Sequence, residues 1–501
     1  MKTCVIIGGG LGGLVSGALL AKEGYKVTVL EKNAIIGGGL QTFKRHGVSF
    51  PTGMHIFGGF TPNGNLEKIF NYLGVTEHLL LQPTDNDAFD VIRVAEDGMT
   101  YRLPKGKEQM VAYLSTYFPK EKENLRAYFD HLYSLSEEED LFYLRESQPY
   151  GTTRFSDDFN SPFDMLIDQY ITNPKLKGLL SYLSPLFGGE EGITPAYLNA
   201  LLSVLHMEGT FQFVGGSQQL AEALKKVIVS ADGQVIANAE VVRIKVANQQ
   251  VGEVVTRDGK VYQADSYISD VHPNVLLHLI DENAFPNAFK KRMASVPETG
   301  SSFKVFIKFK EQAFPYLNNA NYYLENYLNT SKSIKEKWPQ SLFFVTPPVD
   351  CQGDYAETMV VIVPMSFEWV RPWENTKTGH RGEAYENWKH VMINRVLDRM
   401  EMLYPDFRNG IEFVFASSPL TIRDYYGNKE GSNYGFQKDS HNLMLSQMSV
   451  ATKVKNLFLT GQNVNIHGLC GVTLTAIETA EALVGKNVIV RKINNFCLSH
   501  S

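Results

Sequence analysis

The chain has 501 residues, with 48 Lys and Arg against 54 Asp and Glu, a formal net charge of −6 and a pI near 6.1. Its length predicts two or three domains. Hydrophobic residues at 44% and charged residues at 20% are the proportions of a packed globule, which excludes disordered, collagen-like and coiled-coil proteins. The negative charge gives no electrostatic reason to expect a nucleic-acid partner.

Cysteine usage and hydropathy bear on compartment and membranes. The cysteines are Cys4, Cys351, Cys470 and Cys497. Their spacing holds neither a metal nor a redox disulfide, so we expect no metal site and a cytoplasmic protein. The apolar start up to Ala21 looks like a signal peptide, but glycines interrupt it and no small-residue cleavage site follows. No other stretch is long and apolar enough to predict a spanning helix.

The first thirty residues predict a strand, a glycine turn, a helix and a second strand. Cys4 to Ile7 is a continuous apolar run, typical of a parallel strand buried on both faces. The following GGGLGG matches G-x-G-x-x-G with Gly8, Gly10 and Gly13. Gly8 would make the tight turn and Gly10 would let the backbone approach a pyrophosphate, while Gly13 would let the helix press against the strand.

A helix and an acid complete this dinucleotide-binding unit. We expect a helix from Leu14 to Glu23, with its N-terminal N–H groups toward the phosphates, and a strand from Val27 to Leu30. The strand delivers Glu31, whose carboxylate would accept hydrogen bonds from the adenosine ribose. Because an acid repels a ribose 2′-phosphate, NADP is disfavoured, which leaves NAD or FAD.

Two more glycine segments favour the longer cofactor, FAD. The glycines at 37 to 39 predict a second turn that exposes backbone, which makes Gly38 and Gly39 candidate cofactor contacts. Near the C-terminus, a short strand at 456 to 459 is followed by a glycine-interrupted loop and a helix from Val472 to Val484. A helix N-terminus against the flavin ring would stabilise the reduced, anionic flavin. The simpler interpretation of this C-terminal segment is a strand–helix unit that closes the sheet. The same unit can both complete the sheet and contact the cofactor.

The middle of the chain predicts a discontinuous organisation. A helix is expected after Gly216 and strands at 235 to 237 and 241 to 247, followed by a small β meander that includes 267 to 269. The predicted fold class is α/β, with a Rossmann-like FAD-binding domain formed by residues 1–80, 205–290 and 445–501. Residues 81–204 and 291–444, helical near 105–145 and strand-rich near 300–420, predict a substrate-binding domain of mixed sheet and helices.

Several motifs together support a family comparison. They are VIIGGGLGGL, FPTGMHIFGG at 50 to 59, VGGSQQLAEAL at 214 to 224, ISDVHP at 268 to 273 and NLFLTGQNVNIHGLCGV at 456 to 472. Their order resembles the phytoene desaturase, carotenoid isomerase and retinol saturase family of flavoproteins, and within it the retinol saturases.

The resemblance implies FAD as cofactor and a retinoid-like or carotenoid-like polyene as substrate. It implies that Gly8, Gly10, Gly13 and Glu31 bind the adenosine diphosphate and that Val241 flanks the adenine through its backbone. Gly461, Gln462 and Val472 would lie along the ribityl chain and flavin ring. Gly39 departs from the pattern, because many members carry an arginine there.

The implied activity saturates, desaturates or isomerises carbon–carbon double bonds, with hydride transfer at flavin N5 and a proton handled on the adjacent carbon. Candidate catalytic residues are His55, after a glycine-rich turn, and Tyr434, with His467 as a third proton-handling group. Each also has a simpler interpretation as a buried side chain with its polar atoms hydrogen-bonded.

Two alternatives stay open. A flavin amine oxidase would use a lysine near N5, which points to Lys304. However, Lys308 and Lys310 share its strand face and favour a solvent-exposed face. A flavin-free prenyl carrier of the same fold is the third class, and the intact Glu31 and glycine sets argue against it.

The resemblance, together with an aromatic content of 12%, predicts a long apolar tunnel between the cofactor domain and the strand-rich block. Taken singly, each aromatic of that block has a simpler interpretation as a core residue. As a set they are expected to include several tunnel-lining positions: Phe303, Phe306, Phe309, Phe343, Phe344, Phe367, Trp369 and Trp373. An apolar polyene substrate favours transient contact with a membrane surface. A second G-x-G-x-x-G with a trailing acid is lacking, so we expect no separate nicotinamide domain. The electron partner, the reaction direction and the particular polyene are left open.

Overall fold

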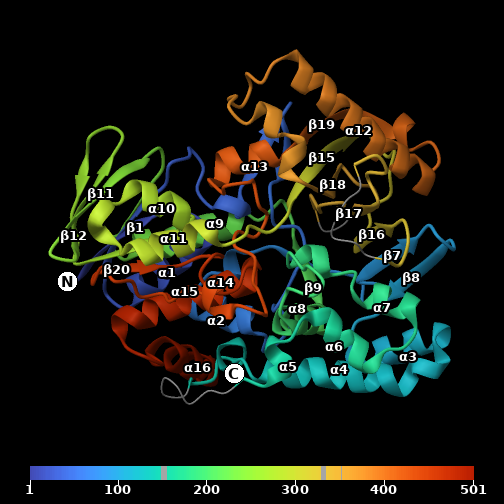
Figure 1. Cartoon of the computed structure of the whole chain (residues 1–501), viewed down its shortest axis with the longest axis horizontal. Coiled ribbons are helices and arrows are strands. Elements are labelled where there is room, and N and C mark those ends of the chain that lie inside the picture. Colours follow the sequence, from blue (N-terminus) through green and yellow to red (C-terminus); the bar gives the residue numbers. More distant parts are fainter. Residues whose placement is uncertain (148–154, 329–334, 351–352, 501) are drawn as a thin grey trace.

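The computed structural model describes residues 1–147, 155–328, 335–350 and 353–500. Its N-terminal strand lies at the centre of a five-stranded parallel sheet of order β10-β2-β1-β14-β20. The strands are β1 (Thr3–Ile7), β2 (Lys26–Leu30), β10 (Gln234–Ile236), β14 (Ser266–Ser269) and β20 (Leu457–Leu459). They come from three stretches that are far apart in the sequence, and Figure 1 shows them at the left of the molecule.

Helices and a small sheet cover the two faces of this parallel sheet. Helix α1 (Leu11–Lys22) is buried along almost its whole length between α9 (Gln218–Ser230) and α15 (Gly468–Val484). On the other face, Val5 and Ile7 pack in one core with Val241 and Leu276. That face is covered by β11 (Val241–Ala247), β12 (Gln250–Thr256), β13 (Val261–Tyr262), α10 (Pro273–Leu279) and α11 (Asn287–Ser295).

The structure corrects three element predictions in this region. The segment at 267 to 269 does not extend the meander. It forms β14, which is buried and pairs in parallel with β1. Helices α1 and α15 begin at Leu11 and Gly468, earlier than expected. In α1, Gly12 and Gly13 pack against the backbone of Gly461 and Gly8, and in α15 Gly471 packs against Ile466.

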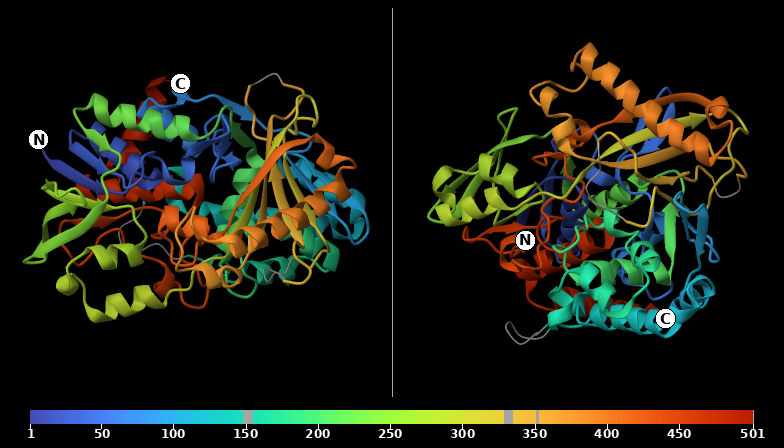
Figure 2. Two further views of the ribbon diagram at one scale, coloured as in Figure 1. Left: turned by 90° about the horizontal axis from the view of Figure 1, so that it is seen from above. Right: turned by 45° about the vertical axis from the view of Figure 1, so that its right-hand side comes forward.

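A seven-stranded mixed sheet of order β19-β15-β18-β17-β16-β7-β8 occupies the other end of the molecule (Figure 2). Helix α12 (Glu383–Leu403) packs on one face, and the hairpin of β3 (Thr42–Arg45) and β4 (Val48–Pro51) packs on the other. The strands are β7 (Asp90–Val94), β8 (Met99–Leu103), β15 (Ser301–Phe309), β16 (Ala320–Leu324), β17 (Ser341–Val345), β18 (Thr358–Met365) and β19 (Ile411–Ser417).

A helical layer lies below this sheet in Figure 1. Its longest helix, α4 (Lys122–Glu137), lies within the segment 105–145 that was expected to be helical. It packs against α8 (Ala196–Glu208). The remaining helices here are α3 (Lys107–Tyr117), α5 (Asp157–Asn160), α6 (Phe163–Tyr170) and α7 (Pro174–Leu180). A small sheet links this layer to the rest through β5 (Phe57–Gly58), β6 (Leu81–Pro83) and β9 (Thr210–Phe213).

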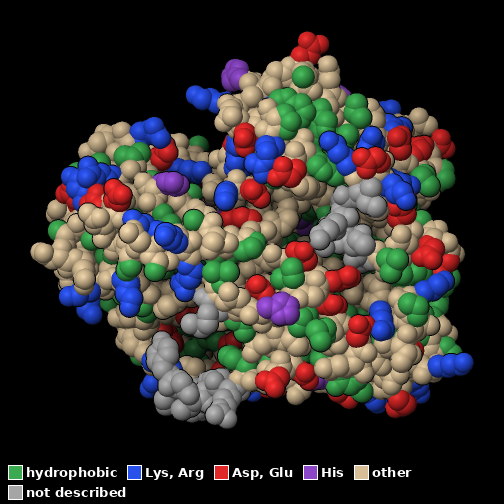
Figure 3. Space-filling model, in the orientation of Figure 1, with side chains coloured by type: hydrophobic (Ala, Val, Ile, Leu, Met, Phe, Trp, Pro, Cys, Tyr) green, Lys and Arg blue, Asp and Glu red, His purple; other side chains and the backbone are tan. Residues whose placement is uncertain are grey.

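The remaining elements are α2 (Asn65–Leu73), α13 (Pro419–Tyr426), α14 (Leu443–Ser446) and α16 (Val488–His500). Within the described ranges, no single helix has the length and apolar composition needed to cross a membrane. Helices α15 and α16 meet that criterion only as a pair, which is bent by 114°. Acidic and basic side chains are interspersed on the face shown in Figure 3. The α/β fold class is thus confirmed, while the predicted domain boundaries stay predictions.

Candidate active site

One cavity of about 740 Å³ runs from the carboxyl ends of the parallel strands to the helical layer. This is where ligands bind in open α/β sheets. Residues predicted for the cofactor line one end, including Gly8, Gly10, Glu31 and Val241. The segment 53–58, Lys304 and Tyr434 line the middle, and residues of α8 line the far end. The cavity therefore joins residues that lie far apart in the sequence.

The first glycine turn brings main chain to the cavity surface. Gly8 has φ +105°, a conformation that L side chains rarely adopt. A Cβ on Gly13 would come 2.2 Å from the carbonyl oxygen of Gly8, so only glycine lets α1 lie this close to β1. A Cβ on Gly10 would come 2.7 Å from Oδ2 of Asp270. The backbone of this turn leaves the N-terminal N–H groups of α1 beside the cavity, where they favour anions.

Glu31 follows the last residue of β2 and is only 6% exposed. Its Oε2 accepts a hydrogen bond from the Gly9 N–H at 2.8 Å, and its Oε1 accepts one from the Asn33 N–H at 2.7 Å. Each carboxylate oxygen has a second lone pair available for a ligand hydroxyl. The carboxylate is therefore oriented by the backbone before any ligand binds.

Asp270 is a second acid at this end, and the sequence analysis assigned it no role. It lies at the end of β14, beside Gly10 and Gly461. Burial raises the pKa of Asp270 to about 7, the N–H groups of Gly13 and Gly10 oppose that rise, and the charge of Glu31 adds to it. Burial thus limits the negative charge at the turn where a pyrophosphate would lie. The sequence carried one sign of this role: Asp270 is an acid that directly follows a predicted strand, in the ISDVHP motif.

The second glycine turn lies directly beside the first. The Gly37 N–H donates to the Gly9 carbonyl at 2.7 Å, and a Cβ on Gly38 would come 3.3 Å from the Gly10 Cα. Gly39 lies near Tyr426, whose hydroxyl would be 3.5 Å from an added Cβ. Both Gly38 and Gly39 line the cavity. Tyr426 therefore occupies the space next to Gly39.

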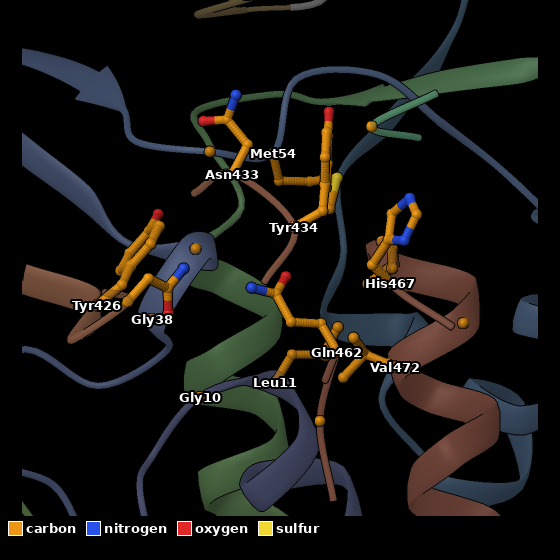
Figure 4. Close-up of a pocket in the computed structure, with 18 of the residues that line it drawn as sticks. Gly10, Leu11, Gly38, Met54, Tyr426, Asn433, Tyr434, Gln462, His467 and Val472 are labelled. Atoms are coloured by element: carbon orange, nitrogen blue, oxygen red, sulfur yellow. The ribbon is translucent and has the colours of Figure 1, made fainter. Parts of the chain in front are cut away.

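The C-terminal segment borders the middle of the cavity. Gly461 has φ +92° and a Cβ there would meet Asp270 Oδ1 at 2.5 Å, so this turn also requires glycine. Val472 lies inside α15 rather than at its start, and it lines the cavity together with Gln462. In Figure 4, Gln462 lies below Tyr434, with Val472 and His467 to one side. These residues come together although Tyr434 belongs to a separate loop.

His55 lies in the middle of the cavity with both ring nitrogens buried. Neither nitrogen has a hydrogen-bond partner within the part of the chain that the structure describes. Burial, and then the charge of Lys304, lower the pKa of His55 to about 3. The imidazole is therefore neutral at physiological pH.

Lys304 differs from the sequence-based expectation of a solvent-exposed strand face. It is 8% exposed, and its Nζ donates to the Thr52 carbonyl at 2.9 Å. Burial lowers the pKa of Lys304 to about 8. The cause is that the hairpin of β3 and β4 covers this face of β15, with Phe43 and Phe50 packed on Phe306. The expectation of a solvated lysine was wrong.

Tyr434 and His467 face each other with ring centroids 4.6 Å apart, and both line the cavity. Burial raises the pKa of Tyr434, so its hydroxyl stays protonated. Burial, and then the charge of Lys438, lower the pKa of His467 to about 3. The middle of the cavity therefore presents neutral polar groups around one titratable amine, that of Lys304.

The aromatic cluster of the strand-rich block was largely misassigned to the tunnel. Phe343 lines the cavity, and the others pack in hydrophobic cores under α12, under the β3–β4 hairpin and around Tyr385. Alternate residues of each strand face away from the cavity, and α12 covers them. Instead, aliphatic side chains form most of the wall at the far end: Leu186, Leu198, Leu201, Leu202, Leu205, Leu324 and Leu342.

The residues present fit a dinucleotide cofactor. The glycine turns leave a cradle that Cβ atoms would fill, and the oriented Glu31 carboxylate stands at one end of it. The cavity continues from there past Gln462 toward Lys304, so a second group attached to the nucleotide has space.

Comparisons with known proteins agree with this geometry. The family described as flavin containing amine oxidoreductase matches residues 11–484. The chain is 28% identical to all-trans-retinol 13,14-reductase of Rattus norvegicus, over 97% of this chain and 86% of that protein. It is 22% identical to chloroplastic prolycopene isomerase 1 of an Oncidium hybrid cultivar, over 92% of this chain and 79% of that protein.

Among solved structures, an oxidoreductase from Methanosarcina mazei shares the fold, with a TM-score of 0.66 and 17% identity over 96% of this chain and 100% of that one. The family match begins at the first residue of α1 and ends at the last residue of α15, so it includes the second glycine turn and both helices that border the cradle. The chain therefore belongs to the flavin containing amine oxidoreductase family.

Proposed function

We propose that the chain binds one FAD non-covalently and uses it to saturate, desaturate or isomerise a carbon–carbon double bond of an apolar polyene. The observation that carries this proposal is the single cavity of about 740 Å³, which joins the Glu31 cradle to a leucine-lined chamber. Its volume lies within the range of roughly 300–1,000 Å³ that is usual for ligand pockets. In this proposal residues 1–80, 205–290 and 445–501 bind the cofactor, and 81–204 and 291–444 bind the substrate.

The apolar wall of the far end supports a polyene over a small amine. A flat apolar chain leaves water at about 25 cal/mol per Å² when it is buried against such a wall. The names of the rat and Oncidium relatives, a retinol reductase and a prolycopene isomerase, point to the same substrate class. Such a substrate partitions into lipid, so we include transient contact with a membrane surface in the proposal.

When bound, the flavin supplies hydride transfer, and the protein must move a proton on the neighbouring carbon. Of the polar groups in the middle of the cavity, Lys304 is the most suitable for this role, although the sequence pointed to it only for the amine oxidase alternative. Its pKa of about 8 lies near neutral pH, where a general acid or base is most effective. His55, with a pKa of about 3, and Tyr434 stay neutral, so they are suited to positioning substrate by hydrogen bonds.

A flavin amine oxidase is the second candidate, and one observation favours it: Lys304 is buried beside the cavity instead of solvent-exposed. The two candidates are separated by incubating the oxidised and the reduced FAD-loaded protein with a retinoid, an acyclic carotenoid and primary amines. The proposal expects polyene absorbance to change with at least one redox form and no hydrogen peroxide with amines. Reduction of the flavin by amines, with hydrogen peroxide and no polyene change, would favour the oxidase.

A further inference from the structure

A buried polar cluster lies at the far end of the cavity, away from the glycine cradle. Asp90, the first residue of β7, is 0% exposed. Its Oδ2 accepts a hydrogen bond from the Tyr182 hydroxyl at 2.7 Å and lies 3.5 Å from Nδ1 of His206. His206 belongs to α8 and Tyr182 follows α7, so three separate elements converge on one carboxyl group.

Tyr322 completes the cluster from the neighbouring strand. β16 pairs in parallel with β7, and Ala320 is the partner of Asp90, so Tyr322 projects from the same face of the sheet. The Tyr322 ring lies 5.0 Å from the ring of Tyr182 and 5.2 Å from that of Phe343. Phe343 in turn lies 6.4 Å from His55, so ring contacts connect the cluster to the middle of the cavity. Tyr182, His206, Tyr322 and Phe343 all line the cavity.

Among the described residues, three polar atoms of this cluster are buried without a hydrogen-bond partner: Oδ1 of Asp90, the hydroxyl of Tyr322 and Nδ1 of His206. The His206 nitrogen already lies 3.5 Å from the other carboxylate oxygen of Asp90, Oδ2. Burial, and then the charge of Asp90, raise the pKa of Tyr322, so its hydroxyl keeps its proton and can donate. Buried polar atoms in native proteins are nearly always paired, because leaving one unpaired is costly. The Tyr322 donor therefore faces the end of the leucine-lined chamber without a partner, and the free acceptor of Asp90 lies behind the lining residues Tyr182 and His206.

We propose that the Asp90–Tyr182–His206–Tyr322 cluster binds the terminal hydroxyl group of a long apolar alcohol. A hydroxyl donates one hydrogen bond and accepts others, so it satisfies Oδ1 of Asp90 and the Tyr322 O–H together. An aldehyde or ether only accepts and leaves Asp90 unpaired. An ammonium group only donates and leaves the Tyr322 proton unpaired. A carboxylic acid would place two carboxyl groups side by side.

This subsite deepens the proposed function and rests on it, since it assigns the substrate an alcohol end and an orientation. A polyene held by its hydroxyl would extend along the leucine wall toward Phe343 and His55, with its middle or distal double bonds toward Lys304. Fixing one end of a flat chain sets which bond lies at the reacting position.

The test compares the affinity of wild-type and Tyr322→Phe protein for two polyenes, one ending in CH₂OH and the other in CH₃. Tyr322→Phe keeps the ring contacts and removes the donor. We expect wild type to prefer the alcohol, and the variant to bind the alcohol roughly 2- to 12-fold more weakly with the hydrocarbon unchanged. Tyr323→Phe is the matched control, because Tyr323 is also buried with an unpartnered hydroxyl but faces the α12 core.

Asp90→Asn provides a second readout. At the position of the free carboxylate oxygen, the amide presents either an NH₂ donor or an uncharged oxygen, which is a weaker acceptor than a carboxylate. We expect the preference for alcohol over hydrocarbon to fall. If wild type binds both polyenes equally and Tyr322→Phe changes neither, the cluster holds only water and the subsite proposal is overturned, even if polyenes are converted.

A saturated long-chain alcohol and the matching alkane separate this result from failure of the proposed function. If polyenes do not bind but the saturated alcohol binds with the same dependence on Tyr322, the subsite is supported and the polyene activity is not. If none of these ligands binds, both proposals fail.

Discussion

At the β1 end of the cavity the wall is largely main chain, because Gly8, Gly10 and Gly38 expose backbone there. At the α8 end the wall is side chain, mostly leucine, with a polar cluster behind it. The first end has almost no freedom to change, since added Cβ atoms would meet backbone or a buried acid. At the α8 end, single side chains can be substituted without moving the backbone.

This difference explains how one fold serves different reactions. A backbone cradle binds the same cofactor in any member that keeps its glycines, whereas side chains at the other end select the substrate. Substitutions at the cradle should therefore alter flavin binding, and substitutions in the rest of the cavity should alter substrate binding or turnover.

Lys304→Met is expected to give the largest effect, which should fall on turnover alone. Loss of a general acid or base typically costs about 10²- to 10⁴-fold in rate, while FAD content should equal that of wild type. The measurement is steady-state conversion of polyene together with the flavin absorbance of the purified protein. Lys308→Met is the control on the same strand, because Lys308 pairs with Glu357 away from the cavity. Equal losses in both variants would contradict the role.

Glu31→Ala should act at the opposite end. Removing charge-assisted hydrogen bonds to the ribose is expected to weaken FAD binding by about 1.5–3 kcal/mol, which flavin titration of the apoprotein measures. Polyene affinity of the fully loaded variant should stay at the wild-type value. Glu253→Ala serves as control, since Glu253 pairs with Lys245 on β11 and does not line the cavity. Unchanged FAD affinity in Glu31→Ala would contradict the proposal that this carboxylate binds the cofactor.

Gly13→Ala tests the backbone wall directly. The new Cβ would lie 2.2 Å from the Gly8 carbonyl, so α1 must move away from β1. We expect a loss of about 1–3 kcal/mol in the free energy of unfolding, together with weaker FAD binding, as measured by urea unfolding and flavin titration. Gly252→Ala carries the same substitution in an open position with nothing within 4 Å. It should change stability by no more than about 1 kcal/mol.

The pH profile of kcat/KM should show the ionisation of Lys304 near pH 8. If the enzyme saturates the double bond, protonated Lys304 donates, and the rate falls about tenfold per pH unit above 8. If the enzyme desaturates, neutral Lys304 accepts, and the rate rises until pH 8. The sign therefore reports the direction of the reaction. A profile without an inflection near 8, or one that Lys304→Met leaves unaltered, would refute this assignment.

The cradle was predictable because its requirements are local. Glycine spacing, apolar strands and Glu31 occur within one short segment, and the structure keeps that order from β1 to the end of β2. The start of α1 was predicted too late because packing holds Gly12 and Gly13 in the helix, against the low helix propensity of glycine. For Gly12 the neighbour is Gly461, which is remote in sequence.

The middle and the far end of the cavity were not predictable in the same way, because their properties depend on residues from distant parts of the chain. Lys304 is buried by a hairpin that lies about 250 residues earlier, and the strand pattern around Lys304 carries no sign of that cover. The Asp90 cluster combines residues from four elements, none of which forms a local motif. The aromatic residues failed as tunnel markers because strand alternation sends many of them to the opposite face.

The central claim is that flavin and polyene share one cavity. The most direct measurement is a titration of the FAD-loaded protein with a conjugated polyene alcohol, following the flavin and polyene absorbance bands together. The account predicts that both bands change with the same saturable, one-to-one dependence on polyene. Bands that stay unchanged with polyene, together with reduction of the flavin by a primary amine and release of hydrogen peroxide, would contradict it.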